Sequence, residues 1–301
     1  MDLRRIRGYL QLCRPANLPT AAADILAGLA IAGILAPDQI EALGYHGFAL
    51  VLVSLAGGSK LLYAGGVVLN DVFDAELDKI ERPERPIPSG LIPKGHAALF
   101  GGVLLLSGIG LVSISHAFSV WIAVMLGVAI LIYDGIAKQH ALFGPLFMGI
   151  CRGLNLWMGM YMMGFTEALP FIWIPVVYIF AITSVSRGEV DAGNRKQIIL
   201  AGILYAIAIL GVAFMIGTHG SQFWWGVPFL GIFATMVYLP LIKAYRSNTA
   251  GHVRAAVKGG VLGLVVMDAA WAAGFAGWIP GILVMSLLPL SGYLSKRFAV
   301  T

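Results

Sequence analysis

The sequence predicts an all-α protein whose helices form a polytopic transmembrane bundle. Hydrophobic residues make up 59% of the 301 residues and charged residues only 12%, and the mean hydropathy is +0.86. Soluble domains are typically about 45–50% apolar and about 25% charged, so this chain has too few polar residues to cover a water-exposed surface. Lipid is therefore the expected solvent, and we expect a single integral-membrane domain over residues 1–301.

Apolar stretches recur along the whole chain and are separated by short polar segments. A transmembrane helix needs about 20 mainly apolar residues. Ten stretches approach this length, at residues 20–36, 45–69, 95–115, 118–134, 142–164, 168–186, 197–217, 222–242, 255–277 and 279–295. Gly149 with Gly153, and Gly259 with Gly263, have the spacing of small residues that allows close helix contact. Hydropathy alone thus predicts ten spans, of which the last two are the least clearly separated.

The lysines and arginines indicate the orientation of the bundle. If the N-terminus lies in the cytoplasm and the spans alternate, 18 of the 20 basic residues fall in cytoplasmic segments and none falls on the other side. This asymmetry follows the positive-inside rule, so the pI of about 9.2 needs no nucleic-acid-binding surface. The basic N-terminal segment lacks the apolar core of a signal peptide, and we expect it to lie uncleaved at the membrane surface.

Four ionisable residues are predicted at membrane depth: Asp24, Lys60, Arg152 and Asp268. Each would cost roughly 2.5–3.5 kcal/mol at a lipid-facing helix centre, so they should face the bundle interior. They either pair with one another structurally or line a substrate cavity. A transporter would also use such residues, but the chain shows no convincing internal repeat.

The most informative segment is the acidic string NDVFDAELD at residues 70–78, which ends the second span. Asn70, Asp74 and Asp78 are four residues apart and Asp71 precedes Asp74 by three, so a continuing helix would place all four on one face. Unpaired carboxylates so close together repel one another, and the negative end of the helix dipole adds to this. Oxygen ligands from one or two carboxylates suit Mg²⁺, and the string predicts a magnesium site.

The loop after this string adds positive charge and rigid turns. Arg82 and Arg85 can bind phosphate oxygens, and Pro83, Pro86 and Pro88 end the helix and stiffen the chain. Together with the acidic string they predict a clamp for a Mg²⁺-bound diphosphate. The alternative is a solvated loop in which the acids and bases pair with each other.

Other catalytic patterns find no support in the sequence. Cys13 and Cys151 belong to no CxxC pattern, and the six histidines form no HExxH motif, so zinc, disulfide and hydrolase chemistry are not indicated. A soluble terpene synthase also uses paired acidic motifs, but ten apolar stretches exclude that architecture.

Three segments resemble the UbiA superfamily of intramembrane prenyltransferases. These are RPANLPTAAADILAG near the start, NDVFDAELD at the end of the second span and RPERPIPSG after it. The resemblance extends from about residue 14 to beyond residue 196, and residues 70–90 are its most specific part. It implies an all-helical bundle, typically of nine spans, around a central cavity that opens sideways to the lipid.

The resemblance also implies roles for individual residues. The acidic string would hold a prenyl diphosphate through Mg²⁺, with Asn70, Asp74 and Asp78 as metal-site residues and Asp71 beside them. Asn17 matches an asparagine near the substrate pocket. Tyr133 and Lys138 resemble a family element in which the tyrosine faces the reacting prenyl carbon and the lysine contacts the diphosphate.

The second acidic motif of the family is only partly matched. When DxxDxEGDxxxG is aligned on Glu189 and Asp191, its two earlier aspartate positions carry Ser184 and Arg187. Glu189 and Asp191 are therefore the expected second set of metal ligands, and a second Mg²⁺ is an open question. The leaving diphosphate would instead be neutralised by the basic residues of this loop, namely Arg187, Arg195 and Lys196.

Taken together, these features predict a Mg²⁺-dependent prenyltransferase. It would transfer a prenyl group from a prenyl diphosphate to an aromatic or other small polar acceptor within the membrane and release diphosphate. The ring face of Tyr133 would stabilise the allylic carbocation. The N-terminus and both acidic loops would be cytoplasmic, at the plasma or inner membrane of a bacterial source. The alternatives are a transporter or a protein that binds isoprenoid or lipid without catalysis.

Overall fold

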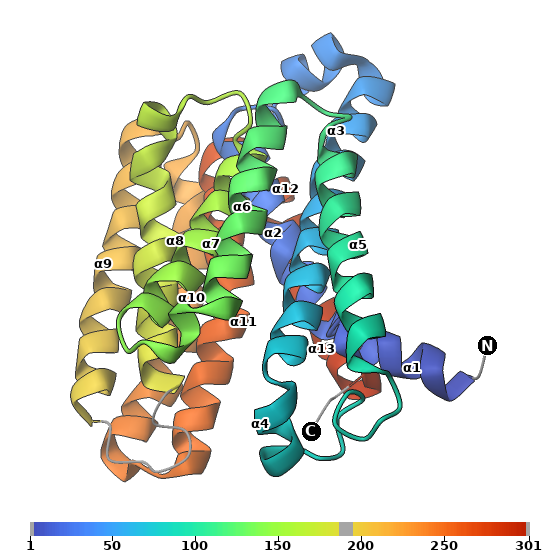
Figure 1. The fold of residues 1–301 in the computed structure, drawn as a ribbon. Helices are drawn as coiled ribbons and strands as arrows, with labels where there is room; N and C mark the ends of the chain where they lie inside the picture. Colours follow the sequence, from blue (N-terminus) through green and yellow to red (C-terminus); the bar gives the residue numbers. More distant parts are fainter. Residues whose placement is uncertain (1–2, 187–194, 299–301) are drawn as a thin grey trace.

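In this computed structural model, long helices run roughly along one axis and form an elongated bundle (Figure 1). The structure describes residues 3–186 and 195–298, and no residue within these ranges lies in a strand. The elements are, in order, α1 (Leu3–Leu12), η1 (Pro15–Asn17), α2 (Leu18–Ile31), α3 (Pro37–Phe73), α4 (Ala75–Glu81), α5 (Lys94–Val112), α6 (Ala117–Gly135), η2 (Ala137–Gln139), α7 (Phe143–Gly159), α8 (Phe165–Ser186), α9 (Arg195–His219), α10 (Phe223–Ser247), α11 (Ala250–Ala276), α12 (Trp278–Met285) and α13 (Leu287–Phe298). The predicted all-α bundle is confirmed.

Every predicted span coincides with helical structure, although two of the helices are short. Eight helical segments among the described residues are long and apolar enough to cross a membrane, with α12 and α13 forming one broken segment. The other two predicted spans correspond to α2 and α7, which have 14 and 17 residues. A full crossing needs about 17–25 residues, so α7 is at the lower limit and α2 is too short, and the count is near the nine spans that the family resemblance implied.

Helix α3 contains a backbone break where its predicted span begins. Gly44 has φ 68° and ψ 154°, which is not a helical conformation, and glycine adopts it without a steric penalty. The segment before this glycine lies at the end of the bundle away from α4 (Figure 1). The remainder of α3 runs through the bundle to Phe73 and carries the start of the acidic string to the opposite end.

Helices α2 and α7 cross at a pair of glycines, and this crossing positions the interior of the site. A methyl group added to Gly28 would lie 2.5 Å from the carbonyl oxygen of Leu156, and one added to Gly159 would lie 2.6 Å from that of Ile25. These distances are too short for any side chain, so the two backbones touch only because both positions are glycine. The crossing brings the buried polar residues of α2 next to those of α7.

The predicted pair Gly149 and Gly153 makes a second close crossing, between α7 and α8. Methyl groups at these positions would lie 2.7 Å and 2.9 Å from the carbonyl oxygens of Val176 and Ile172. Helix α7 therefore packs through glycine against both α2 and α8, and its remaining face is free to line a cavity.

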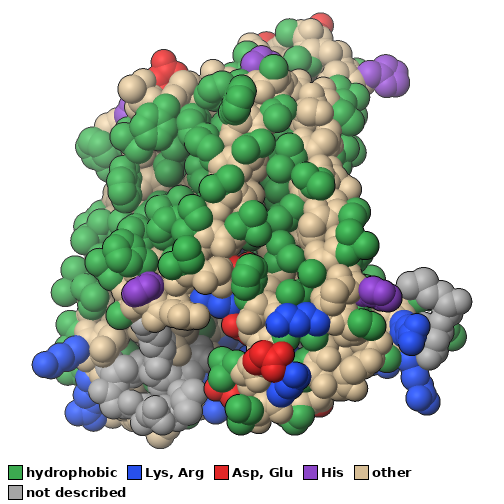
Figure 2. Space-filling model, viewed as in Figure 1, with side chains coloured by type: hydrophobic (Ala, Val, Ile, Leu, Met, Phe, Trp, Pro, Cys, Tyr) green, Lys and Arg blue, Asp and Glu red, His purple; other side chains and the backbone are tan. Residues whose placement is uncertain are grey.

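On the face shown in Figure 2, apolar side chains cover the length of the molecule, and lysine and arginine side chains gather at one end together with several acidic ones. Leu106, Leu210 and Phe214 are examples of large apolar residues that point outward, with 66–71% of their surface exposed. This pattern suits a lipid environment. The charged end carries α4, the end of α3 and the start of α9 (Figure 1), and is called the α4 end below.

Candidate active site

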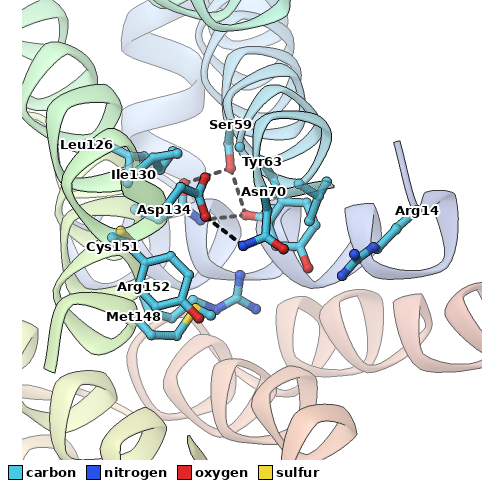
Figure 3. A pocket seen from close by; sticks show the side chains of 15 residues that line it. Arg14, Ser59, Tyr63, Asn70, Leu126, Ile130, Asp134, Met148, Cys151 and Arg152 are labelled. Carbon is cyan, nitrogen blue, oxygen red and sulfur yellow. Dashed lines mark hydrogen bonds between the residues drawn. The ribbon is translucent and has the colours of Figure 1, made fainter. Parts of the chain in front are cut away.

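A cavity of about 250 Å³ lies inside the bundle towards the α4 end (Figure 3). Its walls come from α2, α3, α6 and α7, together with the arginine that precedes η1. The lining residues are Arg14, Ala21, Ser59, Tyr63, Gly66, Val67, Asn70, Leu126, Ile130, Tyr133, Asp134, Met148, Cys151, Arg152 and Asn155. Polar side chains lie at both ends of the cavity, and mostly apolar side chains lie between them.

Helix α3 supplies one complete wall of the cavity. Ser59, Tyr63, Gly66, Val67 and Asn70 all line it, and their spacing of three and four residues places them on one helix face. At a rise of 1.5 Å per residue, Ser59 and Asn70 are about 16 Å apart along the helix axis. The cavity therefore joins the acidic end of α3 to the middle of the bundle.

The acidic string meets basic side chains from three separate parts of the chain. Arg14 Nη2 lies 2.5 Å from Asp71 Oδ1, while Arg85 Nη1 lies 3.3 Å from the same oxygen and 2.7 Å from Asp78 Oδ2. Lys138 Nζ lies 2.6 Å from Asp74 Oδ1. We call these residues, together with Asn70 and Asp134, the mouth cluster. It brings Arg85 and Lys138 to the acidic string, where both pair with carboxylates, and the pairing of Arg85 is what the alternative interpretation of the loop expected.

The acidic string does not form one continuous helix. Helix α3 ends at Phe73, Asp74 has φ −85° and ψ 0°, and α4 begins at Ala75. Asp71 and Asp78 therefore share Arg85, whereas the Asp74 side chain, 29% exposed, turns towards Lys138. Of these acids, Asp74 is the one most open to solvent.

Glu76 belongs to the same string but lies apart from the cavity. It is exposed, and its carboxylate accepts a hydrogen bond from Lys79 Nζ at 2.8 Å. This bond and the positive charge of Lys79 lower the pKa of Glu76 below its usual value. Glu76 therefore offers a nearby acid that serves as a comparison for the mouth cluster.

Asp134 is a site residue that the sequence analysis did not identify. It follows Tyr133 on α6, it is only 3% exposed, and its Oδ1 accepts a hydrogen bond from Asn70 Nδ2 at 2.7 Å (Figure 3). Its Oδ2 has no hydrogen-bond partner among the residues that the structure describes. The available signal was a carboxylate inside an apolar span directly beside the predicted tyrosine.

A second polar group lies deeper in the bundle, and we call it the floor cluster. Arg152 Nε lies 3.1 Å from Asp24 Oδ2, and Asn155 Nδ2 donates to the same oxygen at 2.7 Å. Ser59 Oγ donates to Asn155 Oδ1 at 2.7 Å, and the buried carboxylate of Asp268 on α11 is close enough to interact electrostatically with Asp24 and Arg152. Three of the four ionisable residues predicted at membrane depth thus meet here.

The two interpretations of these membrane-depth residues are both realised. Asp24 and Arg152 pair structurally, as one alternative predicted, and Arg152 also lines the cavity, as the other predicted. Lys60 follows Ser59 on α3 but is exposed on the outside of the bundle.

Several other predicted site residues do not line the cavity. Arg82 is exposed at the end of α4, Asn17 ends η1, and Lys196 is exposed at the start of α9. The Arg195 guanidinium lies over the ring of Tyr245, 6.0 Å from its centroid. The three predicted residues Arg187, Glu189 and Asp191 lie outside the described residues.

The oxygen donors of the mouth cluster fit a hard divalent cation that is completed by other ligands. Carboxylate oxygens and the Asn70 amide oxygen are the type that Mg²⁺ prefers, and Mg²⁺ usually takes one or two carboxylates along with water and substrate phosphate. No three Asp, Glu, His or Cys side chains within residues 3–186 and 195–298 form a metal-binding group by themselves. The cluster therefore suits an ion that arrives with an anionic ligand.

The fold and this cavity define a class of protein: an integral-membrane helical bundle with an internal cavity whose mouth is charged. The family model described as the UbiA prenyltransferase family matches residues 23–188, which is more than half of the chain. The chain belongs to this family, as its resemblance in the sequence implied, and is a prenyltransferase.

Curated relatives support this assignment over most of the chain. The digeranylgeranylglyceryl phosphate synthase of Sulfurisphaera tokodaii is 27% identical over 282 residues, covering 88% of this chain and 97% of the relative. The enzyme of the same name from Saccharolobus solfataricus is 32% identical over 180 residues, covering 59% of this chain and 60% of the relative.

Solved structures share the fold at lower sequence identity. A structure of a digeranylgeranylglyceryl phosphate synthase has a TM-score of 0.66 and 19% identity, covering 91% of this chain and 99% of the other. A UbiA homologue from Archaeoglobus fulgidus, solved with GPP and Mg²⁺, has a TM-score of 0.68 and 13% identity, covering 93% and 99%. The helical arrangement is therefore that of the family.

Proposed function

We propose that this protein transfers a prenyl group from a prenyl diphosphate to a small acceptor inside the cavity, in a Mg²⁺-dependent reaction that releases diphosphate. The observation that carries the proposal is the cavity itself. Three members of the mouth cluster, Arg14, Asn70 and Asp134, line it, and from there it continues between apolar side chains into the bundle. A charged head with an apolar tail fits such a cavity.

In this proposal the mouth cluster binds the diphosphate and its cation. Asn70 and Asp74 hold Mg²⁺, which when bound neutralises the charge that develops on the leaving diphosphate. Arg14, Arg85 and Lys138 supply fixed positive charge to the phosphate oxygens, an arrangement that is often the largest catalytic contribution. The binding of GPP and Mg²⁺ by the Archaeoglobus fulgidus homologue supports this assignment.

Asp71 and Asp78 enter the proposal through an exchange of partners. Each is paired with an arginine in the structure, and Asp74 is likewise paired with Lys138, so all three acids must exchange partners before they bind a cation. When diphosphate oxygens accept hydrogen bonds from the Arg85 guanidinium, they replace the Asp78 carboxylate. Asp78 can then join the metal site that the sequence predicted. The loop residues Glu189 and Asp191 would complete the site, and the loop's basic residues Arg187, Arg195 and Lys196 would add positive charge.

The middle of the cavity suits a reactive cation. Loss of diphosphate from an allylic carbon leaves a delocalised carbocation, which must be kept from water. Leu126, Ile130 and Met148 line this part of the cavity and exclude water. The Tyr133 ring lines it too and offers a π face to the cation, which is worth about 2 kcal/mol when both are desolvated.

The acceptor is a small polar molecule. The name of the curated relatives includes a glyceryl phosphate, which makes phosphorylated alcohols the first acceptors to examine. Aromatic acids are the second group.

We place the α4 end, the N-terminus and both acidic loops on the cytoplasmic side, because the basic residues gather in the same segments. Single cysteines introduced at exposed positions of α4 and before α12 should react with a membrane-impermeant maleimide from opposite sides of sealed vesicles.

The function can be tested with the purified full-length protein in detergent. It is incubated with isotope-labelled prenyl diphosphates of several chain lengths and a lipid extract, with and without Mg²⁺, and the lipids are analysed by mass spectrometry. We expect a new labelled lipid and free diphosphate only when Mg²⁺ is present. If the prenyl diphosphate binds but is not consumed in the presence of the lipid extract, the chain is instead a non-catalytic isoprenoid-binding protein. Movement of intact donor across proteoliposomes would indicate a transporter.

A further inference from the structure

Arg152 on α7 has a donor group that the structure leaves unused. The residue is 8% exposed and lines the cavity. Its Nε forms an ion pair with Asp24 at 3.1 Å without making a hydrogen bond, and its Nη2 is also buried without a hydrogen-bond partner among the described residues. Buried donors are nearly always paired in native proteins, so an unpaired guanidinium nitrogen at a cavity wall indicates a missing ligand.

The surrounding side chains fix the orientation of this guanidinium. Asp24 Oδ2 accepts from Asn155 as well as facing Arg152 Nε, and Ser59 holds the other end of the Asn155 amide. Asp268, buried on α11, interacts electrostatically with this pair. The four helices α2, α3, α7 and α11 therefore hold one edge of the guanidinium against Asp24.

We propose that the floor cluster binds the polar head of the acceptor, and that Arg152 recognises a carboxylate or phosphate oxygen on it. The planar guanidinium fork matches both groups, whereas a lysine would offer only a point charge. This inference rests on the proposed prenyl transfer, because it assigns one of the two substrates of that reaction to the floor of the same cavity. The diphosphate and the acceptor's anionic group then lie at different depths, with the reacting carbon between them.

The inference explains why polar groups occur at both ends of the cavity. The mouth cluster matches the diphosphate, yet Ser59 lies about 16 Å further along α3 than Asn70. The apolar tail of a prenyl diphosphate needs no arginine at that depth. An arginine there, held by one carboxylate and open towards the cavity, indicates a second anion.

Equilibrium binding tests the inference without any turnover. Purified full-length protein in detergent is titrated with 4-hydroxybenzoate, with glycerol 1-phosphate, and with the uncharged counterparts 4-hydroxybenzyl alcohol and glycerol, and its melting temperature is recorded. We expect one anionic probe to raise the melting temperature and its uncharged counterpart to leave it unchanged. The probe that stabilises distinguishes an aromatic carboxylate from a phosphorylated alcohol.

Variants locate the binding at Arg152. Arg152→Lys keeps the charge but removes the fork, and should weaken binding of the anionic probe and raise the acceptor KM by about 10- to 100-fold, with the prenyl diphosphate KM unchanged. Asp24→Asn combined with Arg152→Gln removes both charges together and avoids leaving one buried and unpaired. Lys60→Gln is the matched control, since it removes a positive charge one residue from Ser59 on the outer face of α3.

Three results would overturn the inference. They are equal stabilisation by charged and uncharged probes, full probe affinity in both Arg152 variants, and a rise in the donor KM in place of the acceptor KM. Failure of the proposed function gives a different result, because a protein that binds the anionic probe through Arg152 but never releases diphosphate retains the subsite and loses only the reaction.

Discussion

The mouth cluster and the floor cluster contain similar residues in different surroundings. At the mouth, the side chains of Arg14 and Asp74 are 31% and 29% exposed, whereas those of Asp71, Asp78 and Arg85 are only 4–11% exposed. On the floor, Asp24, Arg152 and Asp268 lie within helices and are 2%, 8% and 1% exposed. Breaking an ion pair costs little free energy where water can solvate the separated charges, and much more where water is excluded. The partly exposed groups of the mouth, Arg14 and Asp74, can therefore exchange partners more easily than the floor, which is part of the fold.

The largest expected effect comes from breaking the floor. Asp24→Ala leaves the Arg152 guanidinium buried without its carboxylate, and loss of one partner of a buried ion pair costs about 3–5 kcal/mol. We expect a large fall in the melting temperature of the detergent-solubilised protein. A melting temperature equal to that of the wild type would show that the floor does not stabilise the fold.

The next effect separates the mouth from the floor. Asp74→Ala should lower turnover by about 100- to 1,000-fold, to near the limit of detection, since removal of one preorganised electrostatic group typically costs about 2.7–4 kcal/mol in the barrier. The melting temperature should change little. Turnover is measured as diphosphate release. Glu76→Ala is the matched control, because this acid lies two residues away and contacts only exposed lysines, so it should retain activity.

A smaller effect is expected at the wall between the two clusters. Tyr133→Leu removes the aromatic face and should lower kcat by roughly 30-fold, corresponding to about 2 kcal/mol of cation–π stabilisation. Tyr133→Phe keeps the ring and should retain most of the rate. Equal losses in the two variants would mean that the hydroxyl, and not the ring face, is the group that acts.

The smallest effect concerns the thiol beside the mouth. Burial raises the pKa of Cys13 from 9.0 to about 11, so the folded protein holds almost no thiolate below pH 9. In a Cys151→Ser background, maleimide labelling should be slow at pH 8, rise only as the pH approaches 11, and be rapid after unfolding. Fast labelling of the folded protein at pH 8 would contradict the burial of this residue.

The sequence predicted the fold well, because the helices depend on short-range patterns. Hydropathy identified the helices, and the spacing of Asn70, Asp74 and Asp78 identified the acidic string. The sequence could not predict which side chains pair with the acidic string, since Arg14 and Asp71 are 57 residues apart and Asn70 and Asp134 are 64 residues apart. Such contacts depend on how the helices pack.

The helix break at Asp74 and the floor cluster show the same limit. No proline or glycine marks the break within residues 70–78, so the spacing alone suggested a single helix face. Asp24 and Asn155 are 131 residues apart and meet because Gly28 and Gly159 let α2 and α7 touch. Glycine spacing indicates that a close contact is possible but does not identify the partner helix.

The central claim is that the mouth cluster holds a Mg²⁺-bound prenyl diphosphate and releases diphosphate. The most direct measurement is diphosphate release by the purified protein from a labelled prenyl diphosphate with acceptor lipids, comparing the wild type, Asp74→Ala and Glu76→Ala with and without Mg²⁺. We predict release by the wild type and Glu76→Ala only with Mg²⁺, and release lowered by about 100- to 1,000-fold in Asp74→Ala. Release that is independent of Mg²⁺, or unchanged in Asp74→Ala, would contradict the assignment.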